Sequence, residues 1–371
     1  MDNRSIEILF KLLRISLSRD DDFSLPDDVN WEEVFELSIR QDVVNIAYDG
    51  LQKILESNSG KIYSFDSPKL EALRYKWIGY GMLAEQKYES YSRVVADLAH
   101  LYSKHGYQIL LLKGYGLSLY YPIPSHRTTG DIDVSVMKQG KKVENAQIEA
   151  DKIFQNDLGM KVTKSKSGHH SHFTFHGTLV ENHYEYSNTY FGSIKARKFE
   201  AILQSLAKSD RQEIKLYGQT IYLPSPTFNA LFLIWHMSTH FCASKISLRH
   251  LCDWRQFLSV EYANVDWSLV NKVLKEYGLA QFADMVNKTT KRYLGFNIDG
   301  VDDIDELKMD ERLIDDIFST NEYKSFLSRI IRFPSFEWKF KMVYHSHWFL
   351  VMNRSLFIHF FHEKDMLEKD I

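Results

Sequence analysis

The sequence changes character near residue 105, where helical periodicity gives way to a short, nearly continuous apolar run. Residues 107–114 read YQILLLKG, a pattern typical of a strand that is buried on both faces. A second strand is predicted over residues 131–137, DIDVSVM, in which apolar and polar side chains alternate. The two patterns together predict a small sheet in the middle of the chain.

Further strands are expected after this pair, before the pattern becomes helical again. They are predicted over residues 161–166, 169–176 and 179–186, and Gly177-Thr178 between the last two indicates a hairpin turn. Beyond about residue 190 the chain is expected to be mostly helical. The predicted helices cover residues 227–241, 248–259, 266–294, 310–332 and 335–365.

The part of the chain before the first strand is also predicted to be helical. Apolar residues recur every three or four positions over residues 31–54 and 67–104, and an amphipathic helix is expected at the N-terminus. The expected fold class is therefore α+β. We divide the chain into an N-terminal helical region (1–104), an α/β core (105–222) and a C-terminal helical domain (223–371).

Composition and charge narrow the classes of function. The net charge of −3 gives no basic field to neutralise many phosphates, so long nucleic acid is not an expected partner. Cys242 and Cys252 stand in no metal-binding spacing, so a zinc ribbon or a disulfide framework is not expected. Apolar runs long enough for a membrane span and a signal-peptide pattern are both missing, which predicts a cytoplasmic protein.

Asp131 and Asp133 carry the strongest chemical signal in the chain. They lie two residues apart on a predicted strand, so both side chains leave the same face. Carboxylates held this close favour a divalent cation between them, and Mg²⁺ (or Mn²⁺) takes such oxygen ligands while it keeps phosphate oxygens. The alternative is a pair of ordinary surface aspartates on an edge strand.

Residues just before this pair have the chemistry of a phosphate site. Lys113 and Gly114 end a buried strand where a short helix begins, so backbone amides could approach a triphosphate closely. Arg127, on the loop before the acidic strand, is able to pair with phosphate oxygens. Each residue alone has an ordinary structural explanation, but their order predicts a nucleotide-binding site.

A third carboxylate is expected from a neighbouring strand, since an in-line displacement at phosphorus uses a metal clamp and a base near the attacking hydroxyl. The segment LVENHYEY places Glu181, His183 and Glu185 on one face. Glu181 is the preferred third acid and Glu185 is the alternative. His183 is expected to position the substrate or to pair with the acid.

These residues resemble a known family, the uncharacterised nucleotidyltransferase family 5 of the polymerase β-like superfamily. The resemblance covers roughly residues 30 to 260. Its motif is close to L-L-K-G-x-x-L, then Y-P, then R-x-x-x-D-x-D, and then a strand like V-D/E-x-H-W/Y. The matching residues here are Leu111-Leu112-Lys113-Gly114, Leu117, Tyr121-Pro122, Arg127, Asp131, Asp133 and Val180-Glu181-Asn182-His183-Tyr184, followed by Pro226, His236, His240, Arg249 and Asp253.

The resemblance implies a small mixed-sheet polymerase β-like nucleotidyltransferase core between helical regions. It implies an enzyme that moves a nucleoside monophosphate from a nucleoside triphosphate such as ATP to an acceptor and releases pyrophosphate. In this reading Asp131, Asp133 and Glu181 bind the metal and act in catalysis. Lys113, Gly114, Arg127 and His183 bind the nucleotide, and neither the base nor the acceptor follows from the sequence.

Two departures from the superfamily leave an alternative open. Lys113-Gly114 stands where the superfamily usually has Gly-Ser, so the serine that touches a phosphate is missing. The third acid is Glu181 rather than the commoner aspartate. The alternative is a catalytically degenerate module that binds nucleotide and serves a regulatory or antitoxin-type role.

Histidines offer a second alternative, a metallohydrolase. His170, His172 and His176 share one face of a predicted strand, but strand spacing rarely supplies a closed tetrahedral zinc site. His236 and His240 form HxxxH on a predicted helix, yet Met237 stands where a metalloprotease has its glutamate. Packing of the helical domain near the cleft is the preferred reading of that pair.

Overall fold

A mixed seven-stranded sheet forms the centre of the fold, which confirms the α+β prediction. The computed structural model describes residues 3–18, 24–26, 28–57, 67–165, 169–187, 194–298, 308–319 and 333–344. The strands lie in the order β3-β4-β5-β2-β1-β7-β6. Their bounds are β1 Gln108–Leu111, β2 Ile132–Met137, β3 Thr163–Lys164, β4 His170–Phe175, β5 Thr178–His183, β6 Gln212–Leu216 and β7 Gln219–Leu223.

Strands β1 and β2 lie in the middle of the sheet, antiparallel to each other. Their outer neighbours run parallel to them, β5 beside β2 and β7 beside β1. Ile109 and Leu111 belong to one hydrophobic core and Leu110 to another, so β1 is buried on both faces as its apolar run predicts. Every residue of β2 is also buried, and this holds the strand in place from both sides.

The described part of the chain beyond residue 190 is mostly helical, as predicted, but strands β6 and β7 were not expected there. They form an antiparallel hairpin at the edge of the sheet, and β7 pairs with β1. The turn contains Tyr217 and Gly218, both with positive φ. Alternation in QEIKLYGQTIYL and its central glycine are a hairpin signal, which the helical patterns on both sides obscured.

Two predicted helices are broken in the structure. The stretch over residues 31–54 forms α2 (Trp31–Arg40) and α3 (Val44–Glu56), with Asp42 between them at a φ of 58°. The stretch over residues 266–294 forms α10 (Trp267–Tyr277) and α11 (Ala280–Leu294), because Gly278 ends α10 in the left-handed conformation. The other helices are α1 Asn3–Leu17, α4 Pro68–Lys104, α5 Tyr115–Ser118, α6 Val143–Asn156, α7 Ile194–Leu206, α8 Pro226–Ala243, α9 Leu248–Glu261, α12 Met309–Phe318 and α14 Phe333–Tyr344.

Parts of two predicted helices, over residues 320–332 and 345–365, lie outside the described residues. Short 3-10 turns cover Pro124–His126 and Tyr262–Asn264. The first of them lies in the loop between α5 and β2. None of the described helices is long and apolar enough to cross a membrane.

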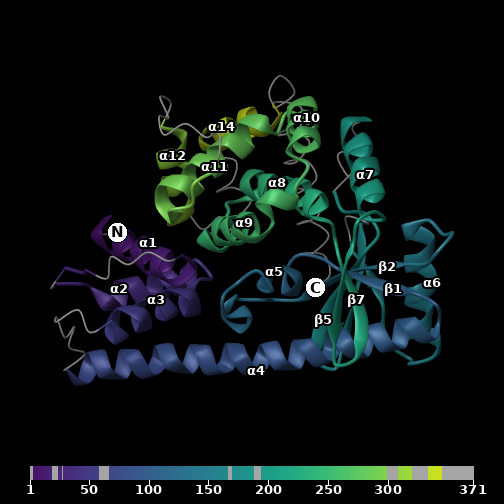
Figure 1. Cartoon of the computed structure of the whole chain (residues 1–371), viewed down its shortest axis with the longest axis horizontal. Helices are drawn as coiled ribbons and strands as arrows, with labels where there is room; N and C mark the ends of the chain where they lie inside the picture. The colour runs from purple at the N-terminus through teal and green to yellow at the C-terminus, as the bar shows by residue number, and fades with distance from the viewer. Residues whose placement is uncertain are drawn as a thin grey trace, which may run out of the picture.

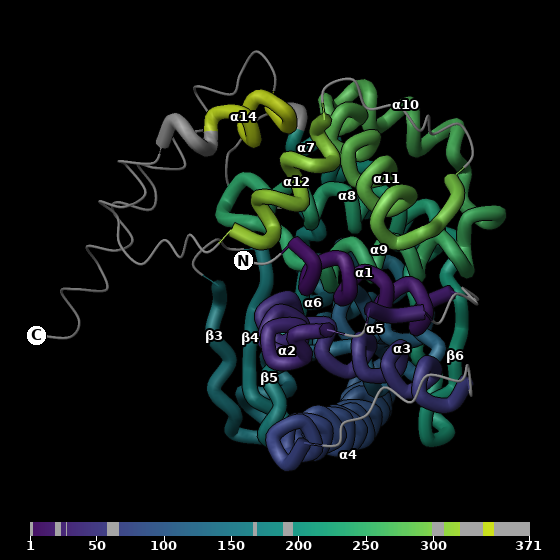
Figure 2. Tube along the Cα trace, turned by 90° about the vertical axis from the view of Figure 1, so that its left-hand side faces the viewer, coloured from purple at the N-terminus to yellow at the C-terminus, as the bar shows by residue number. Residues whose placement is uncertain are grey.

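Two hydrophobic cores lie on the two sides of the sheet. The smaller core joins the sheet to α6 and to the C-terminal half of α4. The larger core joins α1, α2 and α3 to the helices that follow the sheet, and α1 packs directly on α3 and α11. Figure 1 shows α4 running beneath both the N-terminal helices and the sheet, and Figure 2 shows α1 beneath α11 and α12. Segments from the two ends of the chain therefore form one body.

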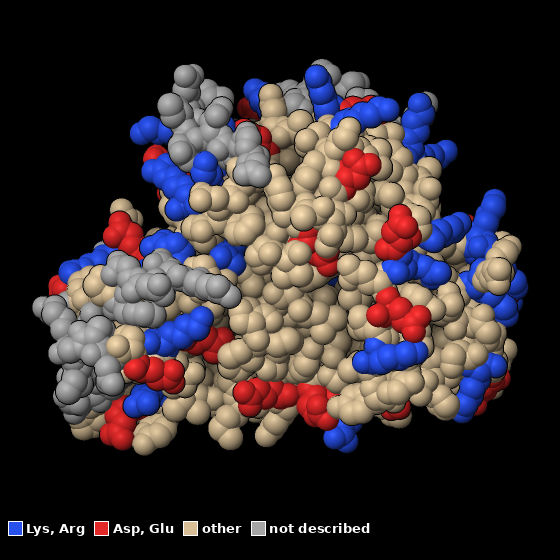
Figure 3. Space-filling view, in the orientation of Figure 1, with Lys and Arg blue, Asp and Glu red and all other residues tan. Residues whose placement is uncertain are grey.

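The face shown in Figure 3 carries no continuous basic field. Lysine and arginine side chains lie mainly toward its periphery and are interspersed with acidic ones. This distribution agrees with the small net charge of the whole chain. The described residues of this face therefore form no basic groove of the kind that binds long nucleic acid.

Candidate active site

The predicted third acid, Glu181, lies beside Asp133 because β2 and β5 are neighbouring parallel strands. In the β2–β5 ladder Asp133 stands opposite Glu181, and His183 follows two residues later on β5. Asp131 comes directly before β2, which begins one residue later than the sequence predicts. Glu185 lies beyond the end of β5, near Tyr184 and α7, so the structure brings Glu181 and not Glu185 to Asp133.

Asp133 is the most enclosed member of the group, with 1% of its surface exposed. Its Oδ1 accepts a hydrogen bond from Lys113 Nζ at 2.8 Å and lies 2.9 Å from His183 Nε2. Burial raises the pKa of this carboxyl, but the charges and hydrogen bonds of Lys113 and His183 hold the pKa well below its ordinary value. Asp133 is therefore ionised at neutral pH.

The second oxygen of Asp133, Oδ2, has no hydrogen-bond partner among the described residues although it is fully buried. Leaving a buried acceptor unpaired costs about 1–3 kcal/mol, and more for a charged group. Gly114 lies against this oxygen with a φ of +67°, and a Cβ on it would stand 3.1 Å from Oδ2. Glycine therefore leaves room beside an oxygen that has capacity for a cation.

Glu181 and His183 complete a compact set of ligand atoms. One ligand atom each from Asp133, Glu181 and His183 lie within 4.8 Å of one another. His183 Nε2 is 3.3 Å from Glu181 Oε2, and the other oxygen of Glu181 is 3.5 Å from His170 Nε2. Burial lowers the pKa of His183, but its hydrogen bonds to Asp133 and Glu181 raise it above the ordinary value.

Asp131 behaves differently from Asp133. Burial and the neighbouring charge of Asp133 raise its pKa above the ordinary value, and Lys113 offsets only part of this effect. Two carboxylates and Glu181 thus repel one another in the absence of a divalent ion. Oxygen ligands with excess negative charge and an unpaired buried acceptor suit Mg²⁺ or Mn²⁺.

A cavity of about 190 Å³ opens over Asp131 and Asp133, whereas Glu181 and His183 are not among the residues that line it. Lys113, Gly114, Asp131 and Asp133 line one side of it, and residues of α8 and α9 line the other. Lys113 follows β1 and Gly114 is the N-cap of α5, as the sequence predicts. Burial lowers the pKa of Lys113, but the charge of Asp133 raises it above the ordinary value, so the ammonium group is charged.

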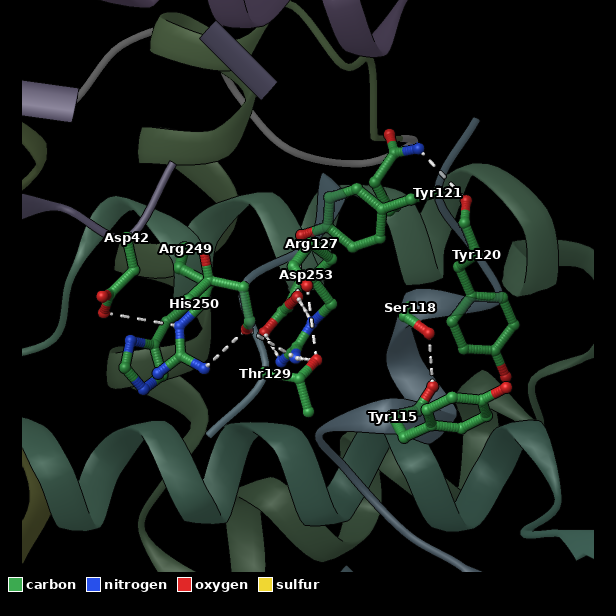
Figure 4. A network of polar contacts seen from close by, with 12 residues as sticks. Asp42, Tyr115, Ser118, Tyr120, Tyr121, Arg127, Thr129, Arg249, His250 and Asp253 are labelled. Atoms are coloured by element: carbon green, nitrogen blue, oxygen red, sulfur yellow. Dashed lines mark hydrogen bonds and ion pairs between the residues drawn. The ribbon is translucent and has the colours of Figure 1, made fainter. Parts of the chain in front are cut away.

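Arg127 lines the same cavity, but its guanidinium is already engaged. It donates to both carboxylate oxygens of Asp253 on α9 at 2.7 Å, and Tyr121 donates to the same carboxylate. Its remaining contacts go to Thr128 and Thr129, and Figure 4 shows this network from close by. The structure thus places Arg127 between the acidic strand and α9, with partners other than the phosphates that the sequence suggested.

The far wall of the cavity contains residues that the sequence only partly indicated. His236 and His240 come from α8, and Arg249 and His250 come from the first turn of α9. The resemblance pointed to His236, His240 and Arg249, but not to His250. Ser247 three residues before His250 forms a capping box with it, and this local spacing is the signal that could have located the start of α9.

Comparisons with known proteins give matches to a solved structure and to a family model. A crystal structure of an antigenic nucleotidyltransferase-like protein from Paracoccidioides brasiliensis is similar over 57% of this chain and 96% of its own, with 15% sequence identity and a TM-score of 0.34. No curated protein matches the chain in sequence. A family model described as uncharacterised nucleotidyltransferase matches residues 27–295, which span β1, β2, β5 and both walls of the cavity. The chain therefore belongs to this family of uncharacterised nucleotidyltransferases.

Proposed function

We propose that the protein is a metal-dependent nucleotidyltransferase, which moves a nucleoside monophosphate from a nucleoside triphosphate to an acceptor and releases pyrophosphate. One observation carries the proposal. Asp133 keeps a buried oxygen without a hydrogen-bond partner among the described residues, and this oxygen lies beside Gly114, where Asp131 also lines the cavity. Such an arrangement is costly for a merely structural aspartate and suits a metal ligand.

Three acids would hold the metal in this proposal. Asp131, Asp133 and Glu181 would bind Mg²⁺ or Mn²⁺, which when bound would offset the charge of the phosphates and of the developing transition state. Glu181, with 21% of its side chain exposed, is the acid that could accept the proton of an acceptor hydroxyl. His183 holds Asp133 and Glu181 in position through its ring nitrogen.

Lys113 and Gly114 would form the nearer part of the nucleotide site. Lys113 is charged and reaches the cavity, so its ammonium group would offset the charge of a bound phosphate chain. Arg127 would act as a positioning residue, because its Nε and Nη2 donate to Asp253 and its Nη1 donates to the carbonyl oxygen of Thr128. The bond to the α-phosphorus would form from the acceptor oxygen while the bond to pyrophosphate breaks.

Asp131→Asn gives the sharpest test of the proposal. The raised pKa of Asp131 shows that its charge is disfavoured without metal, so removing that charge is expected to leave the thermal midpoint equal or higher. Pyrophosphate release with each of the four nucleoside triphosphates and Mg²⁺ should fall at least about 100-fold, the scale of losing a principal electrostatic contact in a transition state.

The matched control is Asp284→Asn, since Asp284 is an exposed aspartate on α11. It should keep both activity and stability. Mn²⁺ should raise the thermal midpoint of the native chain and of this control, and not that of Asp131→Asn. Full pyrophosphate release by Asp131→Asn would overturn the proposed mechanism.

A second function, nucleotide binding without transfer, is favoured by a specific contact. Lys113 Nζ pairs with Asp133 Oδ1 at 2.8 Å, so one of the two oxygens that could bind a metal is already engaged. Lys113 also stands where the superfamily usually has the glycine of its Gly-Ser pair. Calorimetry with ATP and Mg²⁺ alongside the pyrophosphate assay separates the two functions. Tight ATP binding with no pyrophosphate from any acceptor preparation would establish the binding module.

A further inference from the structure

The wall of the cavity opposite the acids is built from three imidazoles and a guanidinium. His236 and His240 lie one turn apart on α8, and His250 faces them from α9. One ring nitrogen of each lies within 4.8 Å of the others. Arg249, next to His250, lines the same cavity. This cluster takes no part in the metal chemistry proposed for the three acids.

Three histidines this close suggest a zinc site, but the hydrogen bonds of His250 argue against zinc binding. Its Nδ1 accepts a hydrogen bond from the backbone N–H of Ser247 at 3.1 Å, as part of the capping box. Burial lowers the pKa of His250 to about 3, so the ring is neutral and its single proton sits on Nε2. An N–H group donates hydrogen bonds and cannot coordinate a metal ion.

The other side chains of the wall have N–H groups that make weak hydrogen bonds or none with the described residues. The ring nitrogens of His236 and His240 make no hydrogen bond within the described part of the chain. Arg249 Nε is buried with no hydrogen-bond partner there, and its ion pair with Asp42 spans 3.6 Å. The hydrogen bond from Arg249 to the carbonyl of Thr128 is long as well, at 3.4 Å. A guanidinium with contacts this weak can take a stronger acceptor.

We infer that this wall, above all Arg249 and His250, binds the terminal phosphates of the nucleoside triphosphate, an inference that rests on the proposed function. The cavity then has one side that holds metal and another that donates hydrogen bonds to anionic oxygen. Arg249 supplies a full charge and His250 a fixed N–H.

This assignment also accounts for the contacts of Arg127. The sequence led us to expect that Arg127 binds phosphate, but Arg127 is bonded to Asp253. In this inference Arg249 takes the phosphate-binding role instead. Arg249 comes from the same helix as Asp253, one turn earlier, and lines the same cavity. Figure 4 shows Arg249 and His250 beside the Arg127–Asp253 pair. The pair thus holds α9, and with it Arg249, against the loop that leads into β2.

The test measures binding of inorganic tripolyphosphate by calorimetry in the presence of a chelator, so that no metal ion bridges the acids to the phosphates. Arg249→Gln and His250→Glu should each weaken binding about 10- to 100-fold, the scale of a charge-assisted hydrogen bond. His250→Glu can still accept from the Ser247 N–H, so the capping box and the thermal midpoint should be preserved. His250→Gln keeps the cap and a donor and should bind better than His250→Glu.

Arg93→Gln is the matched control, because Arg93 is an exposed arginine on α4 that pairs with Glu89. It should bind tripolyphosphate like the native chain. No tripolyphosphate binding by the native chain, or native affinity in both Arg249→Gln and His250→Glu, would overturn the inference. Stoichiometric zinc in the purified protein that is lost in His236→Ala would overturn it in favour of a metal site.

Two further measurements locate the ligand and separate this inference from the proposed function. ATP and AMP are titrated against Arg249→Gln: a loss confined to ATP supports the terminal phosphates, and an equal loss for AMP overturns that assignment. Asp131→Asn should bind tripolyphosphate at least as tightly as the native chain, because it removes a negative charge from the cavity. Failure of the transferase proposal therefore appears in pyrophosphate release, and failure of this inference appears in tripolyphosphate binding.

Discussion

The two oxygens of Asp133 have very different surroundings. Oδ1 is shared by Lys113 and His183, while Oδ2 has no hydrogen bond within the described residues and lies against Gly114. The free energy lost at Oδ2 would be recovered if a ligand bound there, and Gly114 leaves room for such a ligand.

Gly114→Ala is predicted to impair metal binding. The new Cβ would stand 3.1 Å from Asp133 Oδ2 at a φ of +67°, which strains the backbone by about 1–3 kcal/mol and fills the space beside the oxygen. The thermal shift produced by Mn²⁺ should be lost, and transfer with it. Gly159→Ala is the control, because Gly159 also has a positive φ, +62°, and nothing within 4 Å of its added Cβ. It should lose similar stability and keep its Mn²⁺ response; an equal response in both variants would contradict the prediction.

Among the secondary-structure elements, α6 is joined to the sheet by a buried polar network. Asp151 on α6 accepts hydrogen bonds from Ser171 on β4 and Asn182 on β5, and from Gln147 one turn earlier. Gln147 Oε1 is buried and has no partner among the described residues. The hydrogen bonds to Asp151 favour its ionised form, whereas its burial favours the neutral acid.

The stability of this network is predicted to depend on pH. Burial raises the pKa of Asp151 to about 6, and its hydrogen bonds to Ser171 and Asn182 offset only part of the rise. Since the folded pKa exceeds the unfolded value, the stabilising contribution is complete below about pH 4 and is lost as the pH rises through about 6. Asp151→Asn should therefore be more stable than the native chain at pH 7, by about 1–3 kcal/mol, and no more stable at pH 4. Urea unfolding at both pH values measures this, and a constant difference would contradict it.

The contact between the loop before β2 and helix α9 depends on one ion pair. Arg127 and Asp253 are both buried, and Tyr121 donates to the same carboxylate. Arg127→Met should destabilise the fold by about 3–5 kcal/mol, because it leaves the charge of Asp253 buried and unpaired. The double variant Arg127→Met with Asp253→Leu should recover part of this loss, and chemical denaturation of all four proteins gives the coupling energy. Additive losses would show that the two residues do not act as a pair.

At the scale of the whole molecule, the first three helices and the helices after the sheet share one hydrophobic core. Phe10 on α1 contacts Tyr293 on α11 and Phe318 on α12, with ring centroids 5.0 and 6.0 Å apart. Gln41, after α2, bonds to the backbone at Leu248 and at Ile317. The division of the sequence at residues 104 and 222 stays a prediction, and these contacts cross both of its boundaries.

Removal of residues 1–57 is predicted to unfold more than the N-terminal helices. It exposes the apolar faces of α11 and α12 and removes the Gln41 contacts, so the remaining chain should lose its cooperative thermal transition and aggregate. Co-expression of residues 1–57 as a separate chain should restore solubility, and the two fragments should copurify. A soluble chain of residues 67–371 with the native thermal midpoint would show that the N-terminal helices fold apart from the rest.

The sequence predicted what depends on local pattern and missed what depends on contacts between distant segments. A continuous apolar run located β1, alternation located β2, and Gly177-Thr178 indicated the β4–β5 hairpin. The motif around Asp131 indicated the family, which the family match confirms. The β6–β7 hairpin was missed because the helical patterns on both sides obscured its alternation, and its outer strand is only half-buried. The partner of Arg127 was missed because Asp253 lies 126 residues away, and no periodicity in the chain links them.

The shared core has a consequence for how the protein is made. Synthesis delivers α1–α3 first, and the side of α1 that contacts α11 and α12 has no partner until those helices have also emerged from the ribosome. The strands that carry the acids can pair before that moment, whereas the far wall of the cavity is made after them. Long-range contacts of this kind slow folding. A nascent chain arrested after β5 would thus display its carboxylates with nothing opposite them, and the proposed phosphate wall would exist only once α9 had docked.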